Sequence, residues 1–182
     1  MKIIFVGTGS GQTSLNQFHS SLLLSSENYQ LLIDAGDGIS RALLFNKIDI
    51  NHIDGIIITH LHPDHVSGLP SLLVQMKMTE REKPLDIFIH HSLVNIIKDL
   101  LLHSYILPER MKFEVQYKPF KDDEQIYILK NFSFLSRQNS HLSKLQKYNS
   151  NYPSLSLYCP SILFDVEDKK IIYTSDIGSK QR

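Results

Sequence analysis

The residues best suited to chemistry in this sequence lie in one short stretch, where six positions carry four side chains that can bind metal: His60, His62, Asp64 and His65. Imidazole nitrogen and carboxylate oxygen are the donors that hold zinc in catalytic sites, where coordination positions stay open for water. His60 and His62 lie two residues apart and can bind one ion together, while Asp64 and His65 project toward a second. A single histidine would indicate only an ordinary polar loop, but this density predicts a metal site.

The segments around this cluster predict how it is positioned. Residues 56–58 are an apolar, β-branched run that ends at Thr59, which predicts a buried strand with the ligands at its end. Residues 2–6 predict a first strand, and a glycine-rich stretch follows at residues 7–11. A dinucleotide-binding motif needs a further glycine and a helix that opens at once. Neither is present, so these glycines predict a tight loop that brings backbone close to the site.

Composition argues against several other classes of protein. Lys plus Arg equals Asp plus Glu, at 19 each, so no net positive charge favours nucleic acid or an anionic membrane. The N-terminal apolar run is too short for a signal peptide, and no stretch reaches membrane-spanning length. The only cysteine, Cys159, cannot form an internal disulfide, which fits a cytoplasmic protein. The length suits a single domain, assigned to residues 1–182.

Further motifs lie along the chain on both sides of the cluster: Gly-Thr-Gly-Ser at 7–10, Asp-Ala-Gly-Asp-Gly at 34–38, Gly-Leu-Pro at 68–70, His141 and Asp176. Together with the His-X-His-X-Asp-His cluster, they resemble the metallo-β-lactamase fold superfamily, and its ribonuclease Z-like branch in particular. The resemblance implies an α/β fold, the metallo-β-lactamase αββα sandwich, in which two sheets pack face to face with helices outside. The alternation of strands and helices early in the chain, followed mainly by strands, agrees with this fold.

The resemblance also implies which residues complete the site. His141 would join His60 and His62 at a first zinc ion. Asp176 would bridge this ion and a second one, which Asp64 and His65 also bind. Two zinc ions are therefore expected, although manganese and iron suit the same ligands.

The other polar residues near these motifs are assigned supporting parts. Asp34 is expected to hold the ligand loop by hydrogen bonds, and for Asp34 and Asp37 turn and helix-cap chemistry is preferred to metal binding. The histidines not assigned to metal are predicted to lie on the surface or to support the ligands: His19, His52, His90, His91 and His103. Cys159 is predicted to be a small buried side chain on a strand.

The implied reaction is hydrolysis by a zinc-activated hydroxide, because zinc lowers the pKa of bound water from 15.7 to roughly 7. Asp64 is the residue expected to orient or deprotonate this water. Two ions about 3.5–4 Å apart would neutralise a phosphorane-like transition state, which favours a phosphodiesterase. Thioesters and lactones can use the same nucleophile, so an acyl hydrolase of this fold stays open. A catalytically silent scaffold or binding protein is a further alternative, against which the complete first ligand set argues.

Several departures from ribonuclease Z bear on the substrate. This chain has Gln12-Thr13, Phe18-His19 and Ser175 where that family usually carries Pro-Thr, Arg-Asn and glycine. The family also inserts a long arm that clamps transfer RNA between its third histidine and bridging aspartate, and no room for such an arm is expected between His141 and Asp176. A smaller phosphodiester is therefore favoured at least as much as transfer RNA. RNA and a homodimer stay open, and no membrane partner is expected.

Periodicity predicts the remaining elements by residue range. Helices are expected at residues 39–45, 69–79 and 91–106. Strands are expected at residues 20–24, 30–33, 85–90, 113–117, 125–129, 132–136, 155–164 and 170–174. The basic residues Lys77, Arg81 and Lys83 are expected in a solvated loop.

Only residues 177–182 follow Asp176, whereas the family normally adds a helix, a strand and a final histidine that completes the second metal site. The chain is therefore predicted to be a fragment of a longer hydrolase, with an incomplete second half that holds the first ion better than the second. On this hypothesis, apolar residues such as Ile171 and Tyr173 would be exposed on an uncovered sheet face.

Overall fold

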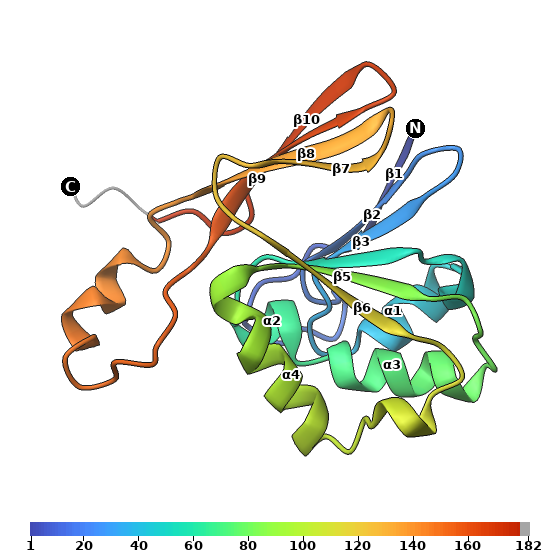
Figure 1. The fold of residues 1–182 in the computed structure, drawn as a ribbon, viewed down its shortest axis with the longest axis horizontal. Helices are drawn as coiled ribbons and strands as arrows, with labels where there is room; N and C mark the ends of the chain where they lie inside the picture. The colour runs from blue at the N-terminus through green and yellow to red at the C-terminus, as the bar shows by residue number, and fades with distance from the viewer. Residues whose placement is uncertain (179–182) are drawn as a thin grey trace.

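Two β-sheets pack face to face in the computed structural model, which describes residues 1–178 (Figure 1). The first sheet contains, in spatial order, β1 (Lys2–Gly7), β2 (Ser21–Ser25), β3 (Gln30–Ile33), β4 (Gly55–Ile58), β5 (Leu85–His90) and β6 (Val115–Phe120). The second contains, in spatial order, β10 (Lys169–Tyr173), β9 (Pro160–Val166), β8 (Phe132–Gln138) and β7 (Gln125–Leu129). The predicted end of the domain, at residues 179–182, lies outside the described residues.

The pairing within the first sheet fixes where the candidate ligands emerge. β1, β2 and β3 are antiparallel, and β3, β4, β5 and β6 are parallel to one another. The carboxyl ends of β3, β4 and β5 therefore lie at one edge of the sheet, where sites in such sheets are usually found. β4 is buried along its whole length, as expected for a strand covered on both faces.

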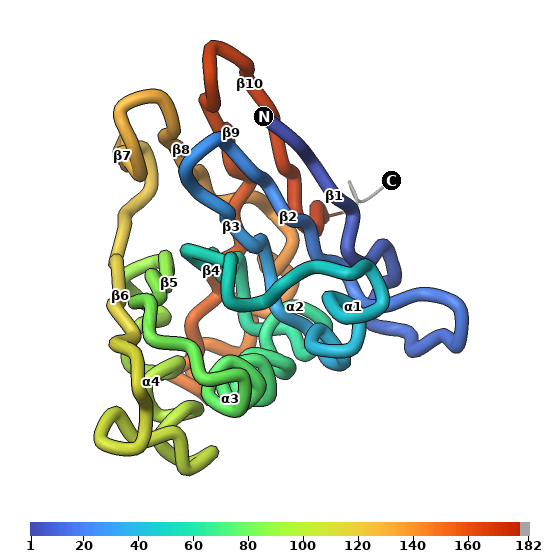
Figure 2. Tube along the Cα trace, turned by 90° about the vertical axis from the view of Figure 1, so that its right-hand side faces the viewer, coloured from blue at the N-terminus to red at the C-terminus, as the bar shows by residue number. Residues whose placement is uncertain are grey.

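The helices gather on the outer face of the first sheet (Figures 1 and 2). They are α1 (Ile39–Phe45), α2 (Pro63–Val66), α3 (Leu69–Met78) and α4 (Val94–His103), with the 3-10 helices η1 (Ile50–His52), η2 (His91–Leu93), η3 (Pro108–Arg110) and η4 (Ser143–Tyr148) elsewhere in the chain. α3 buries Leu69, Leu72, Leu73 and Met76, whose spacing of three and four places them on one side of the helix. Among the described residues, no helix is long and apolar enough to cross a membrane.

Aromatic side chains of β8 and β9 join the second sheet to the first. Phe132, Phe134 and Phe164 are completely buried. The ring of Phe134 lies edge-on to Phe88 of β5, with centroids 5.7 Å apart. Such edge-to-face pairs stabilise a core beyond the area they bury.

The prediction that Ile171 and Tyr173 are exposed is wrong. Both side chains are half-buried against the core, and the Tyr173 hydroxyl donates a hydrogen bond to Asp34. Because side chains alternate along a strand, Ile172 points outward instead and is 70% exposed. It pairs with Leu163 of β9, which pairs with Leu135 of β8, so an apolar row crosses the outer face of this sheet.

A long segment, residues 139–159, connects β8 to β9 and extends away from the sheets (Figure 1, orange). The strand expected at residues 155–164 therefore begins only at Pro160. The segment contains η4 and lies largely exposed.

The expectation of a solvated loop is wrong for Arg81, which is 2% exposed. Its guanidinium donates to the backbone carbonyls of Asn51, Lys83 and Pro84. Arg81 therefore has a structural part, since buried carbonyls need such donors.

Candidate metal centre

The loop after β4 and the ends of β8 and β10 bring three imidazoles and one carboxylate together. Nδ1 of His62 lies 3.1 Å from Nε2 of His60 and 3.2 Å from Nε2 of His141. Oδ2 of Asp176 lies 3.4 Å from Nε2 of His141 and 4.0 Å from Nε2 of His60. Zinc–nitrogen bonds of about 2.0–2.1 Å in a tetrahedron require donor atoms about 3.3 Å apart. The four residues therefore fit a zinc ion.

A second group of donors adjoins the first and shares Asp176 with it. Nε2 of His65 lies 3.7 Å from Oδ2 of Asp64 and 3.6 Å from Oδ2 of Asp176. The structure thus places all six predicted ligands at one site, and Asp176 stands between the two groups. Within residues 1–178, this second group has three donors and the first has four.

Burial and mutual proximity keep two imidazoles of the first group, His60 and His62, neutral. Burial, and then the neighbouring His65, His62 and His141, lower the pKa of His60 to about 2. Burial and His141 also lower the pKa of His62. Metal binding requires neutral imidazole, so these two rings are held in the state that can bind an ion.

Asp34 orients His65, as the sequence led us to expect. Oδ2 of Asp34 accepts a hydrogen bond from Nδ1 of His65 at 2.7 Å, which leaves Nε2 facing Asp64 and Asp176. Burial lowers the pKa of His65, but the hydrogen bond and charge of Asp34, with Asp176 and Asp64, raise it overall. A carboxylate behind a histidine fixes the ring orientation and makes the other nitrogen a stronger donor to metal.

Thr59 and Ser175 also hold the ligands in place, although the sequence did not predict this part for either residue. Thr59 donates its backbone N–H and its hydroxyl to Asp34, and its hydroxyl lies 3.0 Å from Nδ1 of His60. Ser175 donates its hydroxyl to Thr59 across the two sheets. The only signal for Thr59 was a polar residue that ends an apolar strand.

The glycines of the first two loops allow close packing at the site. A Cβ on Gly36 would lie 2.0 Å from the carbonyl oxygen of Asp64, and one on Gly11 would lie 3.4 Å from the Asp64 carboxylate. The close approach predicted for the loop at residues 7–11 is therefore confirmed, and the loop that contains Gly36 approaches the site more closely still. His19 stabilises the first loop through a 2.8 Å contact between its Nδ1 and the carbonyl oxygen of Ser10.

The other residues named from the sequence are not among the candidate donor groups. Asp37, His52, His91 and His103 are exposed, and His90 is half-buried. Cys159 is buried, and burial raises the pKa of its thiol to about 12. This thiol is therefore held in its protonated, unreactive form.

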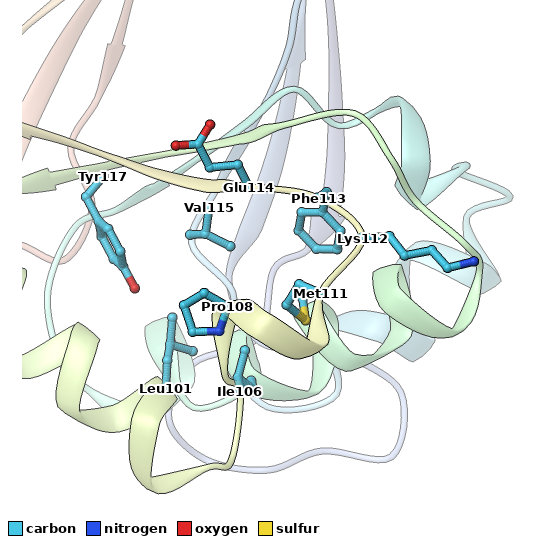
Figure 3. Close-up of a pocket in the computed structure, with 9 residues that line it drawn as sticks. All are labelled: Leu101, Ile106, Pro108, Met111, Lys112, Phe113, Glu114, Val115 and Tyr117. Atoms are coloured by element: carbon cyan, nitrogen blue, oxygen red, sulfur yellow. The ribbon is translucent and has the colours of Figure 1, made fainter.

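A separate apolar pocket lies between the end of α4, η3 and β6 (Figure 3). Its volume is about 530 Å³, and its lining includes Leu101, Met111, Phe113 and Tyr117. None of the six candidate ligands lines it. Chemistry needs converging polar groups, so the imidazole cluster rather than this pocket is the candidate active site.

Comparison with known proteins agrees with this geometry. Ribonuclease Z from Methanocaldococcus jannaschii is 34% identical over 142 residues, which cover 78% of this chain and 44% of that protein. The structure resembles that of the short form of human tRNase Z, ELAC1, with a TM-score of 0.76 and 20% identity over 97% of this chain and 69% of that one. It also resembles the metallo-β-lactamase fold protein YhfI from Bacillus subtilis, with a TM-score of 0.72 and 20% identity over 96% of this chain and 61% of that one.

The chain thus spans less than half the length of this ribonuclease Z, while the two solved structures show its fold. The model of a protein family described as Anti-Pycsar protein Apyc1 matches residues 1–182. The chain therefore belongs to the Anti-Pycsar protein Apyc1 family and is a ribonuclease Z-like member of the metallo-β-lactamase fold superfamily.

Proposed function

We propose that this protein is a metal-dependent hydrolase that cleaves phosphodiesters, with zinc as its metal. The observation that carries the proposal is the convergence of His60, His62, His141 and Asp176, whose donor-atom separations of 3.1, 3.2, 3.4 and 4.0 Å lie near the spacing in a tetrahedral site. The ribonuclease Z relatives support a phosphodiester as the substrate, since RNA is a phosphodiester.

The chain would hold two ions. His60, His62 and His141 would bind the first, Asp64 and His65 the second, and Asp176 both. Bound zinc would supply a water of lowered pKa and positive charge to stabilise the transition state, a function that two ions share in many phosphodiesterases.

The side chains of the chain itself have separable parts in this proposal. Asp64 is 8% exposed and lies beside His65, so its carboxylate can orient the attacking water and accept its proton. Asp34 holds His65 in the required orientation. The side chain of Asp176 is 41% exposed and faces both donor groups, so it sets their spacing while it remains open to substrate.

The net charge of the chain bears on the size of the substrate. Formal net charge is zero, so long-range attraction to a nucleic acid is weak. We favour a small phosphodiester, and RNA remains the competing substrate. Cytoplasmic location, suggested by the single cysteine, and a homodimer belong to the same proposal.

The test combines metal analysis with two chromogenic substrates in the full-length protein. Elemental analysis should find zinc, and bis(4-nitrophenyl) phosphate should be hydrolysed much faster than a thioester. Faster cleavage of the thioester would favour an acyl hydrolase. A protein without metal would favour a silent binding protein, and either result would overturn the proposal.

A further inference from the structure

The side chain of Asn139 connects the segments that carry two of the candidate ligands. Its Oδ1 accepts a hydrogen bond from the backbone N–H of His141 at 2.9 Å. Its Nδ2 donates to the carbonyl oxygen of Asp176 at 2.9 Å and to that of Thr174 at 3.3 Å. One amide group therefore contacts the backbone of both ligand residues.

This connection matters because His141 and Asp176 lie at the ends of strands that are not neighbours. His141 follows β8 and Asp176 follows β10, while β9 runs between these strands. The backbone N–H of Asn139 also donates to the carbonyl of Cys159, just before β9, at 2.8 Å. Asn139 thus joins all three strand ends at the place where Nε2 of His141 and Oδ2 of Asp176 lie 3.4 Å apart.

A second contact, made by Ser175 beside Asp176, shows what Asn139 adds. Ser175 joins this part of the chain to Thr59 of the first sheet, which also supports His60. That contact places Asp176 relative to the ligands of the first sheet. Asn139 places it relative to His141, so the two contacts together define the donor positions of the first group.

We propose that Asn139 is a positioning residue that sets the separation of His141 and Asp176 and so determines the affinity of the first metal site. The inference rests on the proposed metal-dependent function and deepens it. Only an amide meets the requirement, because the His141 N–H needs an acceptor while the Asp176 and Thr174 carbonyls need donors. Groups that hold metal ligands in place typically change metal affinity by about 10–100-fold when they are removed.

The exchange Asn139→Asp separates positioning from charge. It keeps the acceptor for His141 but places a carboxylate oxygen against the two carbonyl oxygens. An added negative charge near the site would tighten zinc binding, whereas displacement of Asp176 would weaken it. We expect weaker binding, by about 10-fold or more, and a similar loss for Asn139→Ala.

Asn46→Asp is the matched control. Asn46 also donates its amide to two backbone carbonyls, those of Val6 and Ala42, but at the end of α1. This exchange should lower the thermal midpoint of the metal-free protein without changing zinc affinity. Zinc affinity would be measured by competition with a chromogenic chelator in the full-length protein, and the visible spectrum of the cobalt-substituted protein would report ligand geometry.

The outcomes distinguish this inference from the proposed function. Weaker zinc binding and an altered cobalt spectrum in both Asn139 variants, with neither in Asn46→Asp, would support the positioning role. Unchanged or tighter binding in Asn139→Asp, or an equal loss in Asn46→Asp, would overturn it. Failure of the unmodified protein to bind zinc would overturn the proposed function itself. If Asn139→Ala does not fold, the milder Asn139→Ser is measured in the same way.

Discussion

Oδ2 of Asp34 and Nδ1 of His65 lie 2.7 Å apart in the buried interior, although the two residues are 31 positions apart in the chain. Asp34 has a φ of 62°, a left-handed conformation that few residues other than glycine, asparagine and aspartate adopt readily. It holds this conformation while its carboxylate accepts hydrogen bonds from Thr59, His65 and Tyr173. The turn after β3 thus uses a side chain that tolerates a left-handed backbone to orient a ligand.

Asp34→Asn should weaken zinc binding at the second site by about 10–100-fold while the fold is retained. Asparagine tolerates the left-handed backbone, but its amide nitrogen would face a donor from Thr59 or His65. Zinc titration of Asp34→Asn checks this. Asp37→Asn is the control, because Asp37 lies exposed in the same turn. Equal affinities in both would show that Asp34 serves the fold alone.

His62→Ala should remove at least one equivalent of metal and nearly all hydrolysis. Nδ1 of His62 lies within 3.2 Å of both His60 and His141, so its loss removes the central donor of the group. His52→Ala is the control, because His52 is an exposed histidine in η1. Full metal content and activity in His62→Ala would contradict the assignment of this cluster.

Asp64→Asn should keep the fold and lower the turnover rate by about 10²–10⁴-fold, the usual contribution of a general base. Asparagine has nearly the same size but lacks the negative charge that binds a second ion and accepts a proton. The thermal midpoint and the turnover of bis(4-nitrophenyl) phosphate would be measured together. An unchanged rate would mean that Asp64 has only a structural part.

Ser175→Ala should lower the free energy of unfolding by about 1 kcal/mol, the usual contribution of one hydrogen bond, because the contact with Thr59 is lost. Ser175→Gly should cost less. Ser175 has a φ of 51°, and glycine adopts this left-handed conformation without the strain that a Cβ causes. Urea unfolding of both variants in the metal-free state checks that Ser175→Ala is the less stable of the two. Equal stabilities would mean that the backbone here is unstrained.

His90 should make stability depend on pH. Its ring stacks on Tyr158 with centroids 3.6 Å apart, and its Nδ1 contacts Ser92. Burial, and then the neighbouring His91, lower its pKa, although Asp122 opposes this effect. The unfolded chain therefore binds a proton more readily, so His90 costs stability as pH falls from about 6.5 toward its lower folded pKa.

His90→Gln should remove this part of the pH dependence. The difference in unfolding free energy between His90→Gln and the unmodified protein would be measured from pH 7.5 to pH 5, because contributions that the two proteins share cancel in this difference. The stability of the variant should decline less over this range. Parallel declines would show that His90 is not held neutral by the fold.

The sequence predicted local features best. Four of the six candidate ligands lie within residues 60–65, after a strand that a short apolar run identifies. The elements at residues 39–45, 85–90 and 125–129 have the predicted limits, because their patterns are strong within a few residues. His141 and Asp176 could be named only through the family resemblance, since each is an ordinary polar residue in its own segment.

The errors concern features that distant contacts decide. The inward direction of Tyr173 depends on Asp34, which is 139 positions away. β9 begins later than predicted because residues 139–159 extend away from the sheets. Apolar side chains in this segment give it a strand-like sequence pattern. Arg81 also donates to the carbonyl of Asn51, which is 30 positions away, and no local pattern predicts this contact.

The division of the ligands between the two sheets also bears on how the protein is assembled. The first sheet supplies four of the ligands: His60, His62, Asp64 and His65. His141 contacts His62 but lies 79 residues later in the chain. During synthesis, the first part of the chain can fold and present four donors long before the others emerge from the ribosome. An ion captured at that stage would later become a reversible cross-link that closes a long loop, and loop closure of this kind restricts the unfolded chain. Chelation would therefore also remove one link between the two sheets, which the aromatic core would continue to join.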